Sequence, residues 1–155
     1  MKPKNRVVPA IIAAIVLATG IYILSGVTSA RAETKSQKIV IHLSRYADSS
    51  HSALMAVHFA QYLQEHGADV TLMLDVEGVG MAAERQVQNS ATGMNAQTSA
   101  YYNGFVKAGG KVLVCPHCAA LAGITAQNLR PGAHLAKNLG ELADVVLAAD
   151  KILDY

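Results

Sequence analysis

Apolar positions in the second part of the chain form short continuous runs separated by stretches of helical spacing. Runs rich in β-branched residues predict buried strands. The predicted strands cover residues 39–43, 69–74, 111–114 and 151–153, with a very short strand after the turn Pro131-Gly132. Because each run is apolar throughout rather than alternating, each strand is expected to be buried on both faces of its sheet.

Helical spacing between these runs predicts helices over residues 53–66, 97–108 and 138–149, with shorter ones over 82–87 and 116–122. Ser52 is expected to cap the first helix and Gly67 to end it. Residues 88–95 are polar and predict a mobile loop. The apolar face of the first helix is expected to contain Leu54, Met55, Val57, Phe59 and Tyr62.

Strands that alternate with helices predict an α/β domain, a three-layer sandwich with a mostly parallel central sheet. Ligands of such sheets bind beyond the carboxyl ends of the strands. This rule brings together the segments that follow three predicted strands, residues 44–51, 75–81 and 115–118.

The first 32 residues have a different pattern. Lys2, Lys4 and Arg6 precede an uncharged apolar stretch over residues 11–24, and the segment ends in Ala30-Arg31-Ala32. These are the parts of a secretory signal peptide, so cleavage after Ala32 is expected. The alternative is an uncleaved anchor that crosses the membrane through residues 7–27. Both predict a domain over residues 33–155 outside the cytoplasm, in the periplasm or anchored to the membrane.

The charge of the domain differs from that of the whole chain. The 155 residues contain 13 Lys and Arg and 11 Asp and Glu, a formal charge of +2. Four of the basic residues lie in residues 1–32, so the domain alone has nine against eleven and a formal charge of −2. An acidic domain without Trp favours neither a nucleic-acid surface nor a base-stacking platform.

Candidate chemistry is concentrated in the tetrapeptide Cys115-Pro116-His117-Cys118, which holds both cysteines of the chain. A pair three residues apart closes too small a loop to stabilise a fold, so thiol chemistry or metal binding explains it better. Cys115 ends a predicted strand at the start of a helix, where unpaired N–H groups and a protonated His117 favour a thiolate. We therefore expect Cys115 to be the nucleophile and Cys118 the resolving thiol.

Two alternatives use the same tetrapeptide differently. Cys115, Cys118 and His117 are soft enough as ligands to bind Cu(I) as a cofactor, but need a further ligand to complete a tetrahedral site. Met81 and Met94 would extend such a set, although surface methionines are the simpler expectation. The other alternative is a passive turn in a non-catalytic, oligomeric binding module, in which the cysteines oxidise to each other.

Several other polar residues are weaker candidates for the site. Asp48, Asp75 and Glu77 follow predicted strands and could orient His117 or bind water, although loop carboxylates are commonly solvated. The remaining histidines of this region are expected to be solvated or to cap the first helix; they are His51, His58 and His66.

The chain also resembles known families. The tetrapeptide is similar to that of DsbA-type thiol oxidants, but here it follows the third predicted strand instead of the first. Five segments resemble, in order, those of the DsrE/DsrF-like (YchN-like) family. They cover residues 38–43, 60–70, 74–79, 114–124 and 149–153.

This second resemblance implies a flavodoxin-like topology, a homo-oligomer such as a trimer or hexamer, and a partner protein that carries sulfur or exchanges thiols. Cys115 precedes Gly123 by eight positions, the spacing of the family's sulfur-carrying cysteine. Cys118 matches a second cysteine that some members have. The implied activity is persulfide relay or thiol–disulfide exchange, that of a sulfurtransferase or a thiol oxidoreductase, without a bound cofactor.

Overall fold

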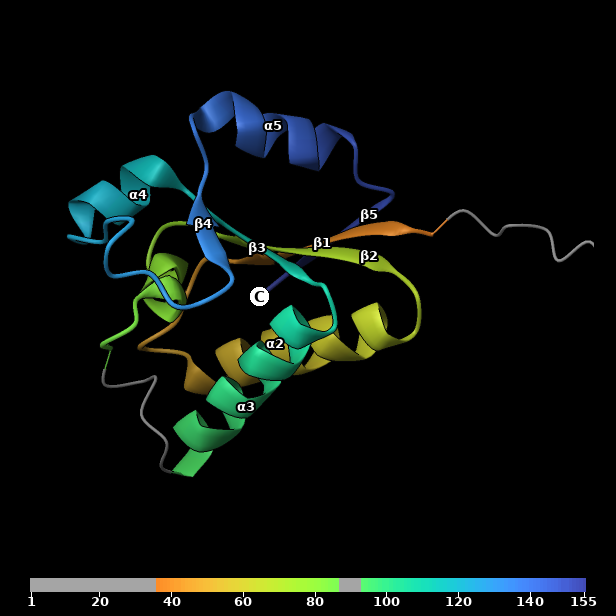
Figure 1. Cartoon of the computed structure of the whole chain (residues 1–155), viewed down its shortest axis with the longest axis horizontal. Coiled ribbons are helices and arrows are strands. Elements are labelled where there is room, and N and C mark those ends of the chain that lie inside the picture. Colours follow the sequence, from red (N-terminus) through yellow and green to blue (C-terminus); the bar gives the residue numbers. More distant parts are fainter. Residues whose placement is uncertain (1–35, 87–92) are drawn as a thin grey trace, which may run out of the picture. The chain divides into compact units, whose positions relative to one another are not determined.

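A computed structural model of the chain describes residues 36–86 and 93–155. One sheet contains every strand of this part, in the order β4-β3-β2-β1-β5 (Figure 1). All its pairings are parallel, and Leu74 at the end of β2 lies between Leu43 of β1 and Val114 of β3. The strands are β1 (Lys38–Leu43), β2 (Asp69–Leu74), β3 (Lys111–Val114), β4 (Ala133–Leu135) and β5 (Lys151–Asp154).

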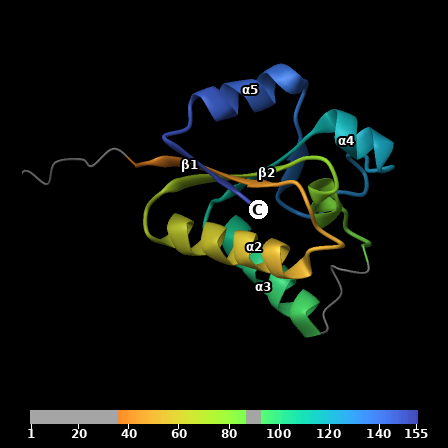
Figure 2. The same ribbon diagram turned by 180° about the vertical axis from the view of Figure 1, so that it is seen from behind.

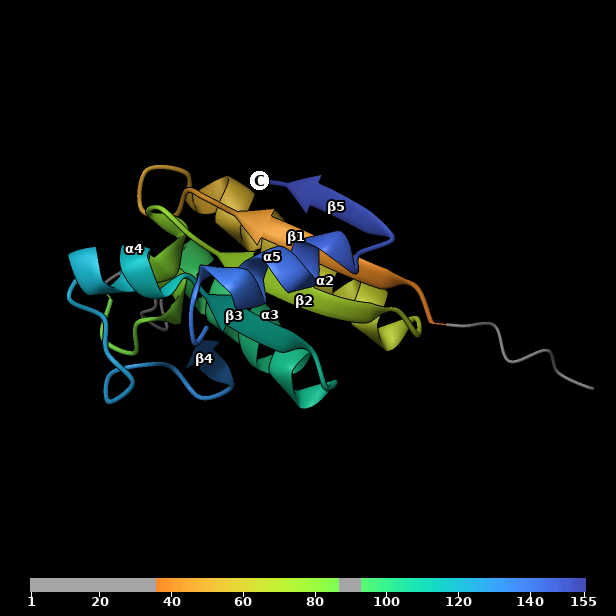
Figure 3. The same ribbon diagram turned by 90° about the horizontal axis from the view of Figure 1, so that it is seen from above.

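Helices cover both faces of this sheet. Helices α2 (Ser50–Glu65) and α3 (Gly93–Lys107) pack side by side on one face, and α5 (Leu139–Leu147) lies on the other (Figures 1 and 2). Figure 3 looks onto the face that α5 covers, with the short α4 (Pro116–Leu121) beyond the carboxyl ends of the strands. The predicted three-layer α/β sandwich is confirmed.

The face of helix α2 that packs against the core consists of small residues. Its buried residues are Ala53, Ala56, Val57 and Ala60. By contrast, Met55, Phe59 and Tyr62 are 40%, 38% and 53% exposed. The predicted apolar face is therefore wrong for these three large residues, because close packing of α2 on the sheet and on α3 selects the alanine side of the helix.

The amino end of α2 differs from the prediction, whereas its carboxyl end agrees with it. The helix begins at Ser50, so Ser49 is the N-cap residue and the expected cap Ser52 is already helical. The Ser49 hydroxyl instead donates to the Ser52 hydroxyl at 2.9 Å. At the other end Gly67 has a φ of +90°, which confirms it as the residue that terminates the helix.

The segment after β2 is tighter than expected. Two glycines within residues 75–81 predict a loop there, but a 3-10 helix, η1 (Gly78–Ala82), forms over part of it. Ala83 then pairs in extended conformation with Leu129. The helix expected over residues 82–87 is therefore wrong as far as Gln86. The expectation of a surface methionine at Met81 is also wrong, because η1 directs this side chain into the core, where it is fully buried.

Some predictions fall outside the described residues. They are the signal peptide over residues 1–32, the alternative anchor over residues 7–27, most of the polar loop over residues 88–95 and the side chain of Met94. Within residues 36–86 and 93–155, no helix has both the length and the apolar character needed to cross a membrane.

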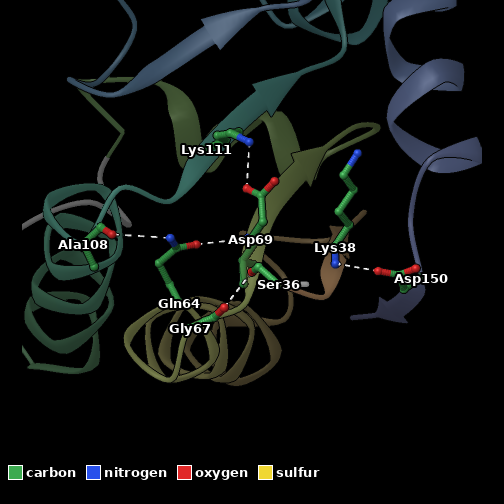
Figure 4. A network of polar contacts seen from close by, with 9 residues as sticks. Ser36, Lys38, Gln64, Gly67, Asp69, Ala108, Lys111 and Asp150 are labelled. Carbon is green, nitrogen blue, oxygen red and sulfur yellow. Dashed lines mark hydrogen bonds and ion pairs between the residues drawn. The ribbon is translucent and has the colours of Figure 1, made fainter. Parts of the chain in front are cut away.

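Polar contacts tie together the amino ends of the strands (Figure 4). Asp69, the first residue of β2, pairs with the Lys111 ammonium of β3 at 2.7 Å. The Gln64 amide accepts from the Val70 N–H at 2.9 Å and donates to the Ala108 carbonyl at 3.4 Å. The amino edge is thus a structural network, and the candidate chemistry lies at the opposite, carboxyl edge.

Candidate functional site

The carboxyl edge of the sheet contains a cavity of about 600 Å³. All three segments predicted to meet there contribute to its wall, which confirms their placement. The lining residues are Tyr46, Ala47 and Asp48 after β1, Val76, Glu77, Val79, Gly80 and Gln86 after β2, and Cys118, Leu121 and Ala122 after β3.

The two cysteines lie close together at the carboxyl edge of the sheet. The Cys115 N–H donates to the Leu74 carbonyl at 2.8 Å, which continues the β2–β3 ladder by one residue. Cys115 is the N-cap residue of α4 and only 4% exposed, whereas Cys118, one turn further on, is half-buried and lines the cavity. Both are free thiols. The third predicted site residue, His117, is exposed beside them and does not line the cavity.

The environment of Cys118 opposes its ionisation. Burial is the main cause that raises the pKa of the Cys118 thiol, and the neighbouring Cys115 and the Asp75 carboxylate raise it further. A hydrogen bond from the Val76 N–H acts in the opposite direction, because it favours the thiolate. Cys118 therefore has one donor that stabilises a negative charge and one carboxylate that opposes it.

The Val76 donor belongs to an unusual turn after β2. Val76 has a φ of +44°, a left-handed conformation that a β-branched residue rarely adopts. The neighbouring N–H groups bind the end of β1: Asp75 donates to the Leu43 carbonyl at 3.3 Å, and Glu77 and Gly78 donate to the Ser44 carbonyl at 3.1 and 3.0 Å. The turn is thus held on β1, beside the cavity that Val76 and Cys118 both line.

Gly78 allows this close approach. A Cβ atom at Gly78 would lie 2.0 Å from the Leu43 carbonyl oxygen, well inside van der Waals contact. Since the obstructing atom is backbone, it cannot move aside as a flexible side chain would. The glycine is therefore a requirement of the turn that positions Val76.

His42, which was not predicted as a site residue, forms a charged cluster behind this turn. Its Nε2 lies 2.8 Å from the Asp75 carboxylate, with both atoms buried and with an alignment outside hydrogen-bond geometry, and its Nδ1 donates to the Asp154 carboxylate. Burial lowers the pKa of His42, but the two carboxylates outweigh it and hold the pKa above its ordinary value of 6.5.

Two signals in the sequence could have identified this cluster. His42 is a polar residue inside an otherwise apolar strand run, one position before the strand ends. Asp75 and Asp154 likewise lie at the carboxyl ends of predicted strands. In a parallel sheet these ends converge, but only the strand order β2-β1-β5 identifies His42 as the residue between the two carboxylates.

The other polar candidates have separate roles. Asp48 pairs with Arg45, which lowers the pKa of the Asp48 carboxyl, and Glu77 lines the cavity. Asp75 is paired with His42. His58 of α2 stacks on Tyr101 of α3, and His66, the C-cap residue of α2, stacks on Tyr62, each with ring centroids 4.0 Å apart.

No described group of three or more His, Cys, Asp or Glu side chains is arranged to hold a metal ion. The two sulfurs alone remain a possible pair of soft ligands for Cu(I), which binds thiolates well. Copper binding by Cys115, Cys118 and His117 stays a prediction.

Solved structures of other proteins share this fold. The YchN protein from E. coli is 23% identical, with a TM-score of 0.62 over 77% of this chain and 99% of that one. The protein MTH1491 from Methanobacterium thermoautotrophicum is 11% identical with a TM-score of 0.60, and it covers 77% of this chain and 100% of its own. The protein BT1422 from Bacteroides thetaiotaomicron is 18% identical with a TM-score of 0.55, over 77% and 95% of the two chains. At these identities the likeness concerns the fold.

A search of curated proteins finds no match. A family model, by contrast, matches residues 37–155, which include all five strands and the Cys115–Cys118 tetrapeptide. The chain therefore belongs to the DsrE/DsrF-like family.

Proposed function

We propose that this chain is an exported DsrE-like protein that handles sulfur or thiols through Cys115 and Cys118. The observation that carries the proposal is the pair of adjacent free sulfurs at the carboxyl edge of the sheet, with Cys118 in the wall of a cavity of about 600 Å³. A cavity of this size suits a small molecule or a short segment of a partner protein.

The adjacent sulfurs support two related reactions. In persulfide relay, a cysteine thiolate attacks the outer sulfur of a donor persulfide, forms a new S–S bond and releases the donor thiolate. In thiol–disulfide exchange, one thiolate attacks a partner disulfide and the second displaces the partner, which leaves a Cys115–Cys118 disulfide and a reduced partner. Both reactions use Cys115 as the predicted sulfur carrier and Cys118 as its close neighbour.

The surroundings of the cavity support a protein-borne substrate. Val76 and Leu121 line it and are 61% and 79% exposed. Exposed apolar side chains next to a reactive group are typical of a docking surface. The carboxylates of Asp48 and Glu77 at the same cavity disfavour a small anionic thiol. We therefore propose a sulfur-carrier or redox partner that presents its sulfur on an uncharged segment.

The test is the intact mass of the native protein isolated from the periplasm under conditions that preserve its oxidation state. A chain that begins at Glu33 is expected, since Ala30-Arg31-Ala32 is the predicted cleavage site. Sulfur transport predicts a species heavier by about 32 Da, and thiol exchange one lighter by about 2 Da, both reversed by reductant. The variant Cys115→Ala should lose either species.

Other masses would contradict the proposal. A protein that stays fully reduced and unmodified after exposure to persulfide and disulfide donors would argue for a non-catalytic module. A copper adduct that requires both cysteines and withstands a competing chelator would favour soft-metal binding. A membrane-embedded product that retains Lys2 would show an anchor instead of a cleaved signal.

A further inference from the structure

The carboxyl ends of β1, β2 and β5 carry an excess of negative charge. In the described part of the chain, these ends and the segments that follow them contain four carboxylates, the guanidinium of Arg45 and the imidazole of His42. The carboxylates are Asp48, Asp75, Glu77 and Asp154. Carboxylates are ionised at neutral pH, so this part of the carboxyl edge favours the approach of a cationic surface.

Most of these carboxylates are compensated within the fold. Arg45 pairs with Asp48 through Nε at 3.1 Å and through a second guanidinium nitrogen, and the imidazole of His42 lies between two of the others. Within residues 36–86 and 93–155, the Glu77 carboxylate forms no hydrogen bond or ion pair, and Arg45 acts on it only at longer range. Glu77 is therefore the carboxylate of this edge whose charge remains available to a ligand.

Glu77 lies in the wall of the same cavity as Cys118. Its N–H donates to the Ser44 carbonyl at 3.1 Å and it is the N-cap residue of η1, so its backbone is fixed while its side chain is exposed. Apolar side chains such as Val76 and Leu121 form much of the remaining wall. A ligand that reaches Cys118 therefore meets an apolar surface inside the cavity and a negative charge at its rim.

A second hollow, of about 390 Å³, adjoins this cavity, because Gln86 and Ala122 belong to the walls of both. Its own wall contains one carboxylate and one guanidinium, those of Glu84 and Arg85, so it has no excess of charge. A small molecule fills one of these spaces, whereas an extended segment of chain can lie across both. The two hollows favour a peptide-like ligand whose positive charge lies on the side of Glu77.

We propose that Glu77 is a specificity-determining residue that selects partner segments with a lysine or arginine beside the reactive cysteine. The inference rests on the proposed function, since it names the chemistry of the partner at that same site. The uncharged part of the segment enters the cavity with its sulfur. The basic side chain is long enough to stay at the rim, where it meets the Glu77 carboxylate. Complementary charge of this kind acts mainly on the rate of association.

The test measures how fast the reduced protein attacks short blocked peptides Gly-Cys-Ala-Xaa, in which Xaa is lysine, glutamine or glutamate and the cysteine forms a disulfide with 2-thiopyridine. A protein thiolate attacks the peptide sulfur, a new S–S bond joins peptide and protein, and the thiopyridine leaves as a coloured thione. Each rate is divided by that of 2-mercaptoethanol, a neutral thiol, with the same peptide. This ratio removes differences in the intrinsic reactivity of the peptides.

The wild type should react about two- to fivefold faster with the lysine peptide than with the glutamine peptide, and more slowly with the glutamate peptide. This is the size expected for one pair of charges about 7 Å apart near the surface. Glu77→Gln should bring the lysine-to-glutamine ratio toward one, and Glu77→Lys should reverse the order of the peptides. Glu65→Gln, the same change of charge at the far end of α2, should keep the wild-type ratio.

The outcomes separate this inference from the proposed function. Equal rates with all three peptides, a wild-type ratio that survives Glu77→Gln, or an equal loss of the ratio in Glu65→Gln would overturn the role of Glu77 alone. A reduced protein that reacts with no peptide faster than 2-mercaptoethanol does would overturn both. The wild type also tests the inference without any variant: added salt should reduce its preference for lysine, and a preference that salt leaves unchanged would contradict a charge at the rim.

Discussion

In the cluster of His42, Asp75 and Asp154, the protonation of His42 affects the stability of the fold. The side chain of His42 is 22% exposed, so its contacts with the two carboxylates are only partly screened by solvent. Because the pKa of His42 is raised in the folded state, the folded protein binds the proton more tightly than the unfolded chain does. The stabilisation is thus fully present below the unfolded-state pKa of 6.5 and is lost as pH rises through the folded-state pKa.

The first prediction follows from the raised pKa of His42 in the folded state. The difference in free energy of unfolding between the wild type and His42→Gln should be largest near pH 6 and should shrink toward pH 8, a range of about two units in which carboxylates stay ionised. Urea unfolding at several pH values measures it. Asp154→Asn should weaken the pH dependence by removing one partner of the imidazolium. A difference that is constant over this range would show that His42 stabilises the fold through packing alone.

A second prediction concerns the left-handed conformation of Val76. This conformation costs a β-branched residue about 1–2 kcal/mol, and glycine is free of that cost but loses about 0.5–1 kcal/mol in backbone entropy. Val76→Gly should therefore leave the stability unchanged or raise it by about 1 kcal/mol, as measured by urea unfolding. Ala143→Gly, in the middle of α5, should instead lower it by about 1 kcal/mol. Equal losses in the two variants would contradict a strained Val76.

At the scale of elements, the turn after β2 connects the sheet to the site. Its N–H groups bind the carbonyls at the end of β1, and η1 follows immediately and directs Met81 into the core. The junction of β3 with α4 supplies the other half, because Cys115 both continues the ladder and occupies the N-cap position of the helix. The site is therefore formed where two strands end, and its geometry depends on how closely the turn approaches β1.

The third prediction tests this approach. Gly78→Ala should lower the free energy of unfolding by about 1–3 kcal/mol, because its methyl group would collide with the backbone of β1. It should also change the alkylation rate of Cys118, since the turn and Cys118 line the same cavity. Gly80→Ala is the matched control: its Cβ would lie 3.1 Å from the Tyr46 ring, a contact that a displacement of a few tenths of an ångström relieves. Comparable effects at the two glycines would show that the turn does not need this contact.

At the scale of the whole molecule, the exposed residues of α5 form the surface through which self-association is expected. Every residue of α5, all of which the structure describes, is at least partly exposed, and Leu139 and Leu147 are 62% and 84% exposed. Ile152 of the edge strand β5 is 46% exposed. Large exposed apolar side chains are typical of surfaces that bind another protein. The expected homo-oligomer would bury them in a closed, symmetric contact.

The fourth prediction is that the domain self-associates through α5. Light scattering at micromolar concentration should give a multiple of the monomer mass. Leu147→Glu should dissociate the assembly by placing a charge in the contact, whereas Met55→Glu, an equally drastic change on the exposed side of α2, should not. A wild-type monomer, or an assembly that only Met55→Glu disrupts, would contradict this surface.

The sequence by itself determined the order of the elements and, from it, the class of fold. Continuous apolar runs alternating with helical spacing are possible in few architectures other than a covered parallel sheet, so the pattern alone is enough to locate the carboxyl edge and its three loops. The tetrapeptide at the end of the third strand followed from the same pattern. The end of α2 before Gly67 was also predictable from the local sequence, because glycine readily adopts the left-handed conformation that ends a helix.

Only the tertiary structure decided which side chains meet. His42 and Asp154 lie 112 positions apart and come into contact because β5 returns to the edge of the sheet beside β1. The burial of Met81, the outward position of Met55 and the placement of Cys118 at the cavity likewise depend on how elements pack. The physical reason is that periodicity reports how a residue is oriented on its own element, whereas contacts between elements depend on strand order and packing, which neighbouring residues in the sequence do not encode.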